Sequence, residues 1–162
     1  MTNILNVSEA VALGIHAMCL IASKTDTILT SLDMASRLKA SRAHLSKVMR
    51  QLVKAGLVRS YYGPAGGFTL QKRNAQISLL DIYEAIEGKF IPSDCLVGRP
   101  ICSGKKCVFG GLLKNVNKEI KEYLDKTTLS KLVDVFGGNG NGKRKASIRK
   151  EAKKSEKKNH KN

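Results

Sequence analysis

Residues 41–70 have the sequence SRAHLSKVMRQLVKAGLVRSYYGPAGGFTL. The first part carries an apolar stripe at helical spacing, made of Leu45, Val48, Met49, Leu52 and Val53. Ser41 is a favourable N-cap for this helix, and Gly56 is placed to end it. Two short β-prone runs, 57–62 and 68–70, then flank the turn-forming residues 63–67. The stretch therefore predicts a helix followed directly by a β-hairpin.

Two further helices are predicted before this stretch. Residues 8–22 are apolar on most faces, so we expect a helix that is deeply buried or lies in an oligomer interface. A second helix follows Ser31, and we expect its Leu32, Ala35 and Leu38 to face inward. Two short helices with basic residues off the apolar stripe of the second are typical of a helix-turn-helix. A hairpin directly after them is typical of the wing of a winged helix.

The sequence after the hairpin predicts three helices and a loop. Ser78 with Asp81 predicts the start of a helix that Gly88 ends, and residues 128–135 predict a last short one. Between them, residues 109–126 predict a longer helix with charged residues on one side. Its opposite side is a narrow apolar seam of Leu113, Val116, Ile120 and Tyr123. Such a seam favours pairing with a partner helix.

These elements predict a mostly α-helical fold with a small β-hairpin, that is, a winged helix-turn-helix plus a long dimerisation helix. We divide the chain into four parts. Residues 1–88 form a DNA-binding winged-helix domain, and residues 89–108 form a cysteine loop. Residues 109–136 form the dimerisation helix and a terminal short helix. Residues 137–162 form a basic tail, expected to be disordered because it is rich in Lys and poor in apolar residues.

The charge of the chain favours a polyanionic partner, and we expect double-stranded DNA. The chain has 29 Lys and Arg against 13 Asp and Glu, a formal net charge of +16. Residues 137–162 hold ten Lys and Arg and two Glu, so the tail carries +8 and the body +8. No segment reaches the ~18 apolar residues of a membrane helix, and the N-terminus lacks the features of an export signal. We therefore expect a cytoplasmic protein with no membrane partner.

Polar and basic residues of the predicted recognition helix are candidates for DNA contact. The first turn of such a helix reaches base edges, so we place Ser41, Arg42 and His44 there. Lys47 and Arg50 are expected to meet phosphates. The alternative for each single charge is a solvated helix face.

The predicted wing adds four candidates. Arg59, Tyr61 and Tyr62 are expected to contact the DNA backbone or the minor groove. Gly63 begins the glycine-rich turn, where the backbone can approach a phosphate closely because there is no Cβ.

Three of the four cysteines, Cys95, Cys102 and Cys107, lie in the predicted loop. A disulfide would leave one of the three over and is disfavoured in the cytosol. A structural zinc usually takes closely spaced pairs, which the six-residue gap between the first two cysteines does not match. An iron–sulfur cluster also takes thiolates, and unused thiols are a further alternative. Cys19 lies inside an apolar helix, where a buried small hydrophobe is expected.

The chain has LVKAGLV at 52–58 with GPAGGF at 63–68, and ISLLDIYEAIEG at 77–88 with cysteines soon after. Together these segments resemble the Rrf2 family of bacterial regulators. The resemblance covers residues 8–135 and implies a dimeric winged-helix transcription regulator that binds palindromic operators. IscR-like and NsrR-like members hold an iron–sulfur cluster, [2Fe–2S] or [4Fe–4S], through three loop cysteines. The matching positions here are Cys95, Cys102 and Cys107.

The sequence departs from this pattern at particular positions. IscR-like members have a histidine three residues past the last cysteine, where this chain has Gly110. Many members have an arginine just before the Gly-Pro of the wing, where this chain has Tyr62. In NsrR-like members a carboxylate near the start of the first helix, from the other subunit, completes the cluster. Glu9, or less favourably Ser8, lies in that region.

The resulting hypothesis is a repressor whose operator binding is controlled by an iron–sulfur cluster that senses nitric oxide, oxygen or redox state, or cluster supply. One alternative is a cluster-free member that acts through thiol redox chemistry or zinc. Another is a regulator that works mainly by docking onto a metabolic enzyme. An enzyme is not expected, because there is no phosphate-binding glycine loop, paired-carboxylate arrangement or nucleophile triad.

Overall fold

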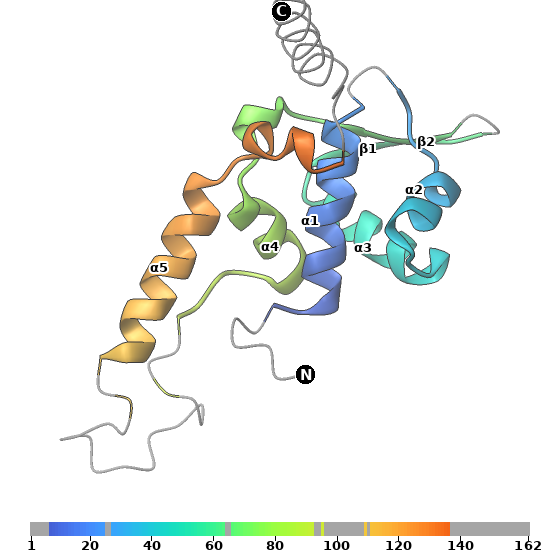
Figure 1. Cartoon of the computed structure of the whole chain (residues 1–162). Coiled ribbons are helices and arrows are strands. Elements are labelled where there is room, and N and C mark those ends of the chain that lie inside the picture. Colours follow the sequence, from blue (N-terminus) through green and yellow to red (C-terminus); the bar gives the residue numbers. More distant parts are fainter. Residues whose placement is uncertain are drawn as a thin grey trace, which may run out of the picture.

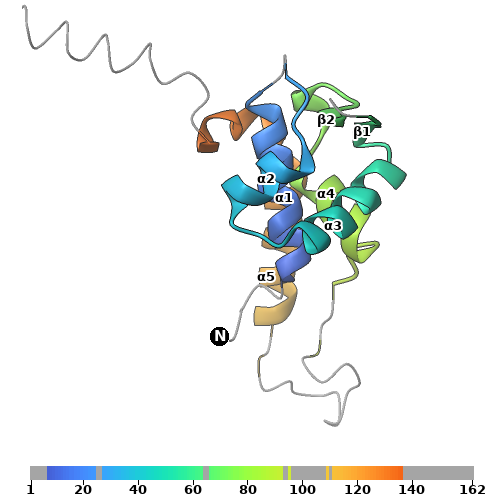
Figure 2. The same ribbon diagram turned by 90° about the vertical axis from the view of Figure 1, so that its right-hand side faces the viewer.

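Helix α1 (Glu9–Ala22) is the element around which the other helices are arranged (Figure 1). The computed structural model describes residues 7–24, 27–63, 66–92, 95, 109 and 111–136. Helices α2 (Ser31–Leu38) and α3 (Arg42–Lys54) lie on one side of α1, and α4 (Leu79–Glu87) lies on the other. Helix α5 (Leu112–Lys126) packs against α4, on the side away from α1. The view in Figure 2 shows α2 and α3 in front of α1, so that the helix-turn-helix covers one face of the molecule.

The start of α1 is fixed by Ser8, whose hydroxyl accepts a hydrogen bond from the Val11 N–H at 3.1 Å. From Val11 onward most of the helix is buried, which confirms the expectation of a central apolar helix. Cys19 is among these buried residues, and burial raises the pKa of its thiol. Cys19 is therefore a small core side chain, as the sequence predicted.

Three helices approach one another at Gly14 of α1. A Cβ at this position would overlap Cδ1 of Ile86 in α4 and would lie 3.3 Å from Cγ1 of Val48 in α3. Ile82 of α4 also lies close, with its Cγ2 3.7 Å from that Cβ position. The absence of a side chain at Gly14 thus sets how closely α3 and α4 can approach α1.

Helices α2 and α3 are joined by a tight turn. Helix α2 ends at Lys39, which has a left-handed backbone with φ of 51°, and α3 begins after the N-cap Ser41. The apolar stripe of α3 is buried at Leu45, Val48, Met49 and Leu52, and its fifth predicted residue, Val53, is half-buried.

The prediction that Leu32 faces inward is wrong, because its side chain is 63% exposed. Helix α2 instead buries Met34 and Ala35. An eight-residue helix offers only two turns of pattern, so the choice between Leu32 and Met34 depends on the packing partner rather than on spacing.

The wing is an antiparallel hairpin of β1 (Val58–Tyr61) and β2 (Gly67–Leu70), in which Val58 pairs with Leu70 and Tyr61 with Gly67. Gly56, with φ of 70°, ends α3 and turns the chain into β1. Leu29 adds a bridge to Phe68, through hydrogen bonds of 2.9 and 3.2 Å in the two directions. The hairpin is thereby attached to the segment that leads into α2.

The segment before α4 contains a short 3₁₀ turn, Asn74–Gln76, and Ser78 then forms the predicted capping box with Asp81. The last predicted helix is instead two 3₁₀ turns, Leu129–Lys131 and Val133–Phe136. Ser78 and Thr128 form an isolated β-bridge, so the chain enters this region extended and only short turns follow. The buried Leu129 anchors these turns to the core.

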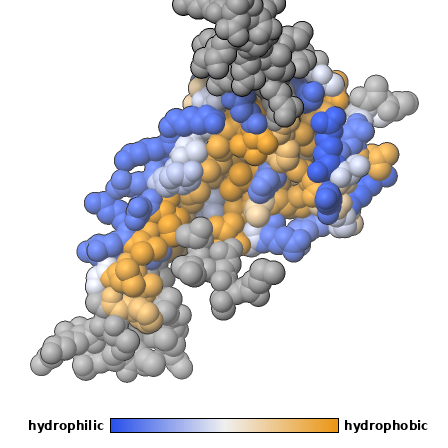
Figure 3. Space-filling view, viewed as in Figure 1, coloured by the Kyte–Doolittle hydropathy of each residue, from blue (hydrophilic) through white to orange (hydrophobic). Residues whose placement is uncertain are grey.

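Helix α5 has no fully buried residue. Within its predicted seam, Leu113, Val116 and Ile120 are half-exposed. Leu112 is 56% exposed and Tyr123 is 63% exposed. Figure 3 shows the resulting hydrophobic surface, which runs along α5 and continues onto the adjoining body. The apolar side of α5 is therefore only partly covered by the described part of the chain, and Leu112 and Tyr123 are left exposed.

The predicted fold class, a mostly helical winged helix with a small hairpin, is confirmed. The division into four parts remains a prediction, since residues 96–108 and 137–162 lie outside the described residues. No helix in the described ranges is long and apolar enough to cross a membrane.

We predict that Gly14→Val lowers the free energy of unfolding by about 1–3 kcal/mol, because the added methyl groups overlap Ile86 and Val48. Chemical denaturation measures the change. Gly111→Ala is the control, since a Cβ there meets only Asn115, at 3.9 Å. Equal stability of Gly14→Val and the parent protein would show that the helices are not tightly spaced at this point.

Candidate nucleic-acid interface and cysteine loop

The first turn and the exposed side of α3 carry three of the predicted DNA-contacting cations. Arg42, Lys47 and Arg50 are exposed, and none of them forms an ion pair with an acidic residue in the described part of the chain. Ser41 is exposed too, and its hydroxyl accepts a hydrogen bond from the His44 N–H at 3.1 Å. Because the opposite stripe of α3 is buried, these cations are held on one outward face.

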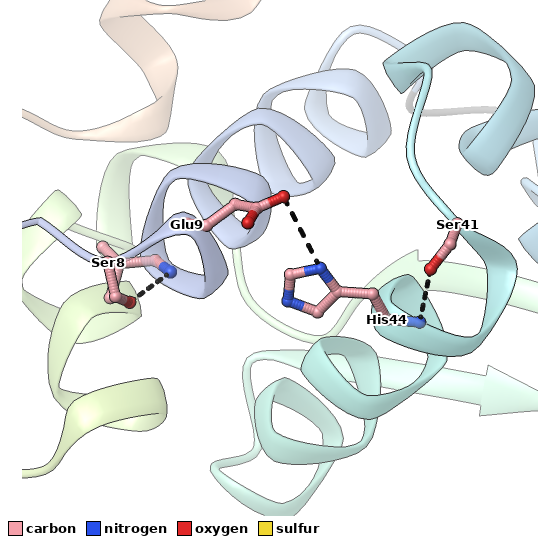
Figure 4. Close-up of polar contacts among 5 residues, drawn as sticks. Ser8, Glu9, Ser41 and His44 are labelled. Atoms are coloured by element: carbon pink, nitrogen blue, oxygen red, sulfur yellow. Dashed lines mark hydrogen bonds and ion pairs between the residues drawn. The ribbon is translucent and has the colours of Figure 1, made fainter. Parts of the chain in front are cut away.

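His44 lies differently from the other candidates (Figure 4). Its ring points toward the first turn of α1, with Nδ1 3.9 Å from a carboxylate oxygen of Glu9. The His44 side chain is 31% exposed and that of Glu9 is 91% exposed. The structure thus brings together two residues that sequence reasoning assigned to different sites, His44 to DNA and Glu9 to a metal cluster.

The wing candidates lie along β1 and at the tip of the hairpin. Arg59 is exposed, Tyr61 is 41% exposed and Tyr62 is 95% exposed. Gly63 has φ of 105°, a conformation that glycine adopts without strain, which explains its place in the turn. At its tip the wing therefore has the exposed ring of Tyr62 next to Gly63, where no Cβ keeps the backbone away from another molecule.

Tyr61 is fixed on the strand by its neighbours. Hydrogen bonds with Thr69 and with Arg59 hold the pKa of the Tyr61 phenol below its ordinary value. Thr69 is the strand partner of Arg59, so these three side chains form one polar group on the exposed side of the hairpin. A cation and a phenol therefore lie together on β1, next to the wing tip.

The predicted metal site is only partly within the described residues. Cys95 is half-exposed, whereas Cys102 and Cys107, together with Gly110, lie outside the described residues. Within the described part of the chain, no three or more His, Cys, Asp or Glu side chains are grouped as metal ligands would be. Glu9, the candidate fourth ligand, is exposed at the start of α1.

The chain that leads from α4 to Cys95 is folded back onto α4. Gly88 has φ of 87°, and the Phe90 N–H donates a hydrogen bond to the Glu84 carboxylate at 3.1 Å. The rings of Phe90 and Tyr83 meet edge to face, with centroids 5.4 Å apart. The first residues of the cysteine loop are therefore fastened to α4.

Three contacts between distant segments are not predicted by any pattern in the sequence. The Gln51 side chain of α3 donates a hydrogen bond to the Ile86 carbonyl of α4 at 3.1 Å. The Ser8 hydroxyl donates to the carboxylate of Glu87, at the end of α4. Leu29 bridges to Phe68 of the wing. Local sequence patterns do not predict such contacts, because each contact joins residues at least 35 positions apart.

Comparison with known proteins places this arrangement in a family. The profile of the family described as "Rrf2: Iron-dependent Transcriptional regulator" matches residues 7–135. The HTH-type transcriptional regulator IscR of Photorhabdus laumondii is 31% identical over 121 residues, which cover 70% of this chain and 73% of that protein.

Two solved structures show the same fold. CymR, the global cysteine regulator of B. subtilis, has a TM-score of 0.68 and 26% identity, covering 83% of this chain and 98% of CymR. IscR of T. potens has a TM-score of 0.61 and 26% identity, covering 77% of this chain and 83% of that chain. The recognition made from the sequence is confirmed: the chain belongs to the Rrf2 family of transcriptional regulators.

Proposed function

We propose that this regulator is a repressor that binds a palindromic operator as a homodimer, with DNA affinity controlled by an iron–sulfur cluster on Cys95, Cys102 and Cys107. The observation that carries the DNA part is the outward face of α3, where Arg42, Lys47 and Arg50 lack acidic partners among the described residues. Unpaired cations on one face of a recognition helix suit a polyanion.

The proposed division of DNA contacts follows the position of each residue. Arg42, in the first turn of α3, would reach base edges, where arginine can bind guanine with two hydrogen bonds. Lys47 and Arg50, farther along the helix, would meet phosphates. Ser41 and His44 would serve beside Arg42. Since the His44 ring points to Glu9, its contact with DNA would be limited to the free side of the ring.

The wing would add contacts at the flank of the operator. Tyr62, which is 95% exposed at the tip, would lie against the minor groove or the sugars, where an aromatic ring can pack on apolar surface. Arg59 and Tyr61 would approach the backbone from β1, and the glycine conformation of Gly63 would let the main chain approach a phosphate.

The proposal of a homodimer rests on α5. Packing against α4 leaves α5 without a fully buried residue, and Leu112 and Tyr123 stay exposed, so a second surface would bury further apolar area. Its apolar seam is continuous with hydrophobic surface on the body (Figure 3). A second copy of α5 offers a matching seam, and the two-fold symmetry of such a pair would match a palindromic operator.

The proposal of a cluster rests on the donor chemistry. Three thiols in one loop suit a group that prefers sulfur ligands, and Cys95, the one described, is half-exposed rather than buried as Cys19 is. An iron–sulfur cluster held by three thiolates supplies an iron with a weaker, exchangeable fourth ligand. Glu9, from the other subunit, is the proposed source of that ligand, and its carboxylate is exposed.

Two alternatives are distinguished by experiment. The fold is shared with a global cysteine regulator, so family membership alone does not fix the signal, and thiol redox chemistry or zinc could replace the cluster. A regulator that acts mainly by docking onto a metabolic enzyme is the other. The unpaired cations of α3 favour DNA over that second alternative.

We predict that Arg42→Ala weakens operator binding and relaxes sequence preference, with a loss of about 1–3 kcal/mol in discrimination between the operator and a base-substituted site. Fluorescence anisotropy with both DNAs measures the change. Lys114→Ala, which removes one exposed cation from α5, is the control and should leave the preference unchanged. Unchanged affinity and preference in Arg42→Ala would show that Arg42 does not read bases.

We predict that Tyr123→Glu converts a dimer into a monomer, because it places a charge in the exposed apolar seam without disturbing the core. Sedimentation velocity at micromolar concentration measures the state. Lys121→Glu, on a neighbouring exposed position of α5, is the control and should remain dimeric. A Tyr123→Glu protein that still sediments as a dimer would refute pairing through this seam.

We predict that the protein purified without oxygen is coloured and contains iron and acid-labile sulfide. The variant C95S/C102S/C107S should lose both, because serine is a poor ligand for iron–sulfur groups. Cys19→Ala should keep both, since Cys19 is a buried core residue. A zinc-loaded or metal-free parent protein would exclude the cluster and favour the thiol or zinc alternative.

A further inference from the structure

The side chain of Gln51 links the DNA-reading helix to the end of α4. Its Nε2 donates a hydrogen bond to the Ile86 carbonyl, with an N···O distance of 3.1 Å. Ile86 lies in the last turn of α4, where carbonyl groups have no partner within their own helix. Gln51 of α3 thus supplies a donor to a carbonyl at the end of α4. This hydrogen bond helps to set the position of α3 along α4.

Packing at the same level makes this link stiff. Val48, one turn before Gln51 on α3, and Ile86 of α4 both occupy the space left by Gly14. Val48 is fully buried and Gln51 is half-buried, so the bond is partly shielded from water. A shift of the α4 end would have to break the bond, open the core at Gly14, or carry α3 with it.

The same turn of α4 is fastened to the chain that leads to the cysteines. Phe90 is attached through its N–H to the Glu84 carboxylate and through its ring to Tyr83. Cys95 follows five residues later. The described contacts thus connect the start of the cysteine loop to α4, and α4 to Gln51.

On the other side of the link, Gln51 follows Arg50 directly and lies one turn after Lys47. Both cations are on the outward face of α3. We propose that Gln51 is a positioning residue that couples the state of the cysteine loop to the placement of α3 on DNA. This inference rests on the proposed function, in which loop chemistry controls operator affinity.

The test compares operator affinity in two backgrounds, the parent cysteines and C95S/C102S/C107S. Gln51→Met keeps the length of the side chain but removes the donor. In full-length protein handled without oxygen, the serine replacements should change parent affinity on the order of tenfold. In Gln51→Met the same replacements should change it much less. If Gln51 had a purely structural role, Gln51→Met would lower operator affinity equally in both backgrounds, and the ratio of the two affinities would not change.

Two further variants sharpen the comparison. Gln51→Lys keeps an N–H donor and should keep the parent ratio, even if its added charge raises both affinities. Gln71→Met, an exposed glutamine on the chain after β2, is the matched control and should also keep it. Should Gln51→Met not fold, Gln51→Ala provides the donor-free variant. Amide hydrogen exchange of α3 should also respond to the serine replacements in the parent and not in the donor-free variant.

The outcomes separate the two proposals. If the serine replacements leave parent affinity unchanged, control by the cysteine loop fails and the coupling role of Gln51 fails with it. If the parent responds and Gln51→Met responds equally, the proposed function stands and the role of Gln51 is overturned. Both the proposed function and the coupling role of Gln51 are supported if the affinity difference between the cysteine and serine backgrounds is lost in Gln51→Met and kept in Gln51→Lys.

Discussion

The close contact of three helices at Gly14 is the constraint on which the rest of the structure depends. A glycine inside a helix costs about 1 kcal/mol relative to alanine. Burying side chains such as Val48 and Ile82 contributes about 1.5–3 kcal/mol each, so the contact is favourable despite that cost. The contact fixes α3, which carries Arg42, Lys47 and Arg50, and α4 against α1.

Features with a local cause could be predicted from the sequence. The caps at Ser8, Ser41 and Ser78 follow from hydroxyl groups that bond to nearby N–H groups, and the stripe of α3 follows from helical spacing. The exposed cations Arg42, Lys47 and Arg50 could be predicted for the same reason, because residues off a buried stripe must face outward. The family resemblance rests on local sequence too, at residues 52–58, 63–68 and 77–88 with the cysteines that follow.

Features with a non-local cause could not be predicted in this way. Helical spacing predicts that Leu32 is buried, but in a short helix it cannot decide between Leu32 and Met34, and the structure buries Met34. The approach of His44 to Glu9 depends on how α3 lies across the start of α1, which no single segment specifies. The link from Gln51 to Ile86 is of the same kind. Contacts that orient residues of α3, such as those of His44 and Gln51, therefore depend on the assembled fold.

Helix α5 gives the protein a property that lies outside any single site. Its ion pairs, Glu122 with Lys118 and Lys126, are exposed and contribute little, and none of its side chains is buried within the chain. In the proposed dimer, part of its order would come from association, and the stability of the regulator would then depend on protomer concentration. Because a dimer forms with the square of monomer concentration, occupancy of the operator would rise more steeply than expression of the protein, and dilution during cell growth would lower it.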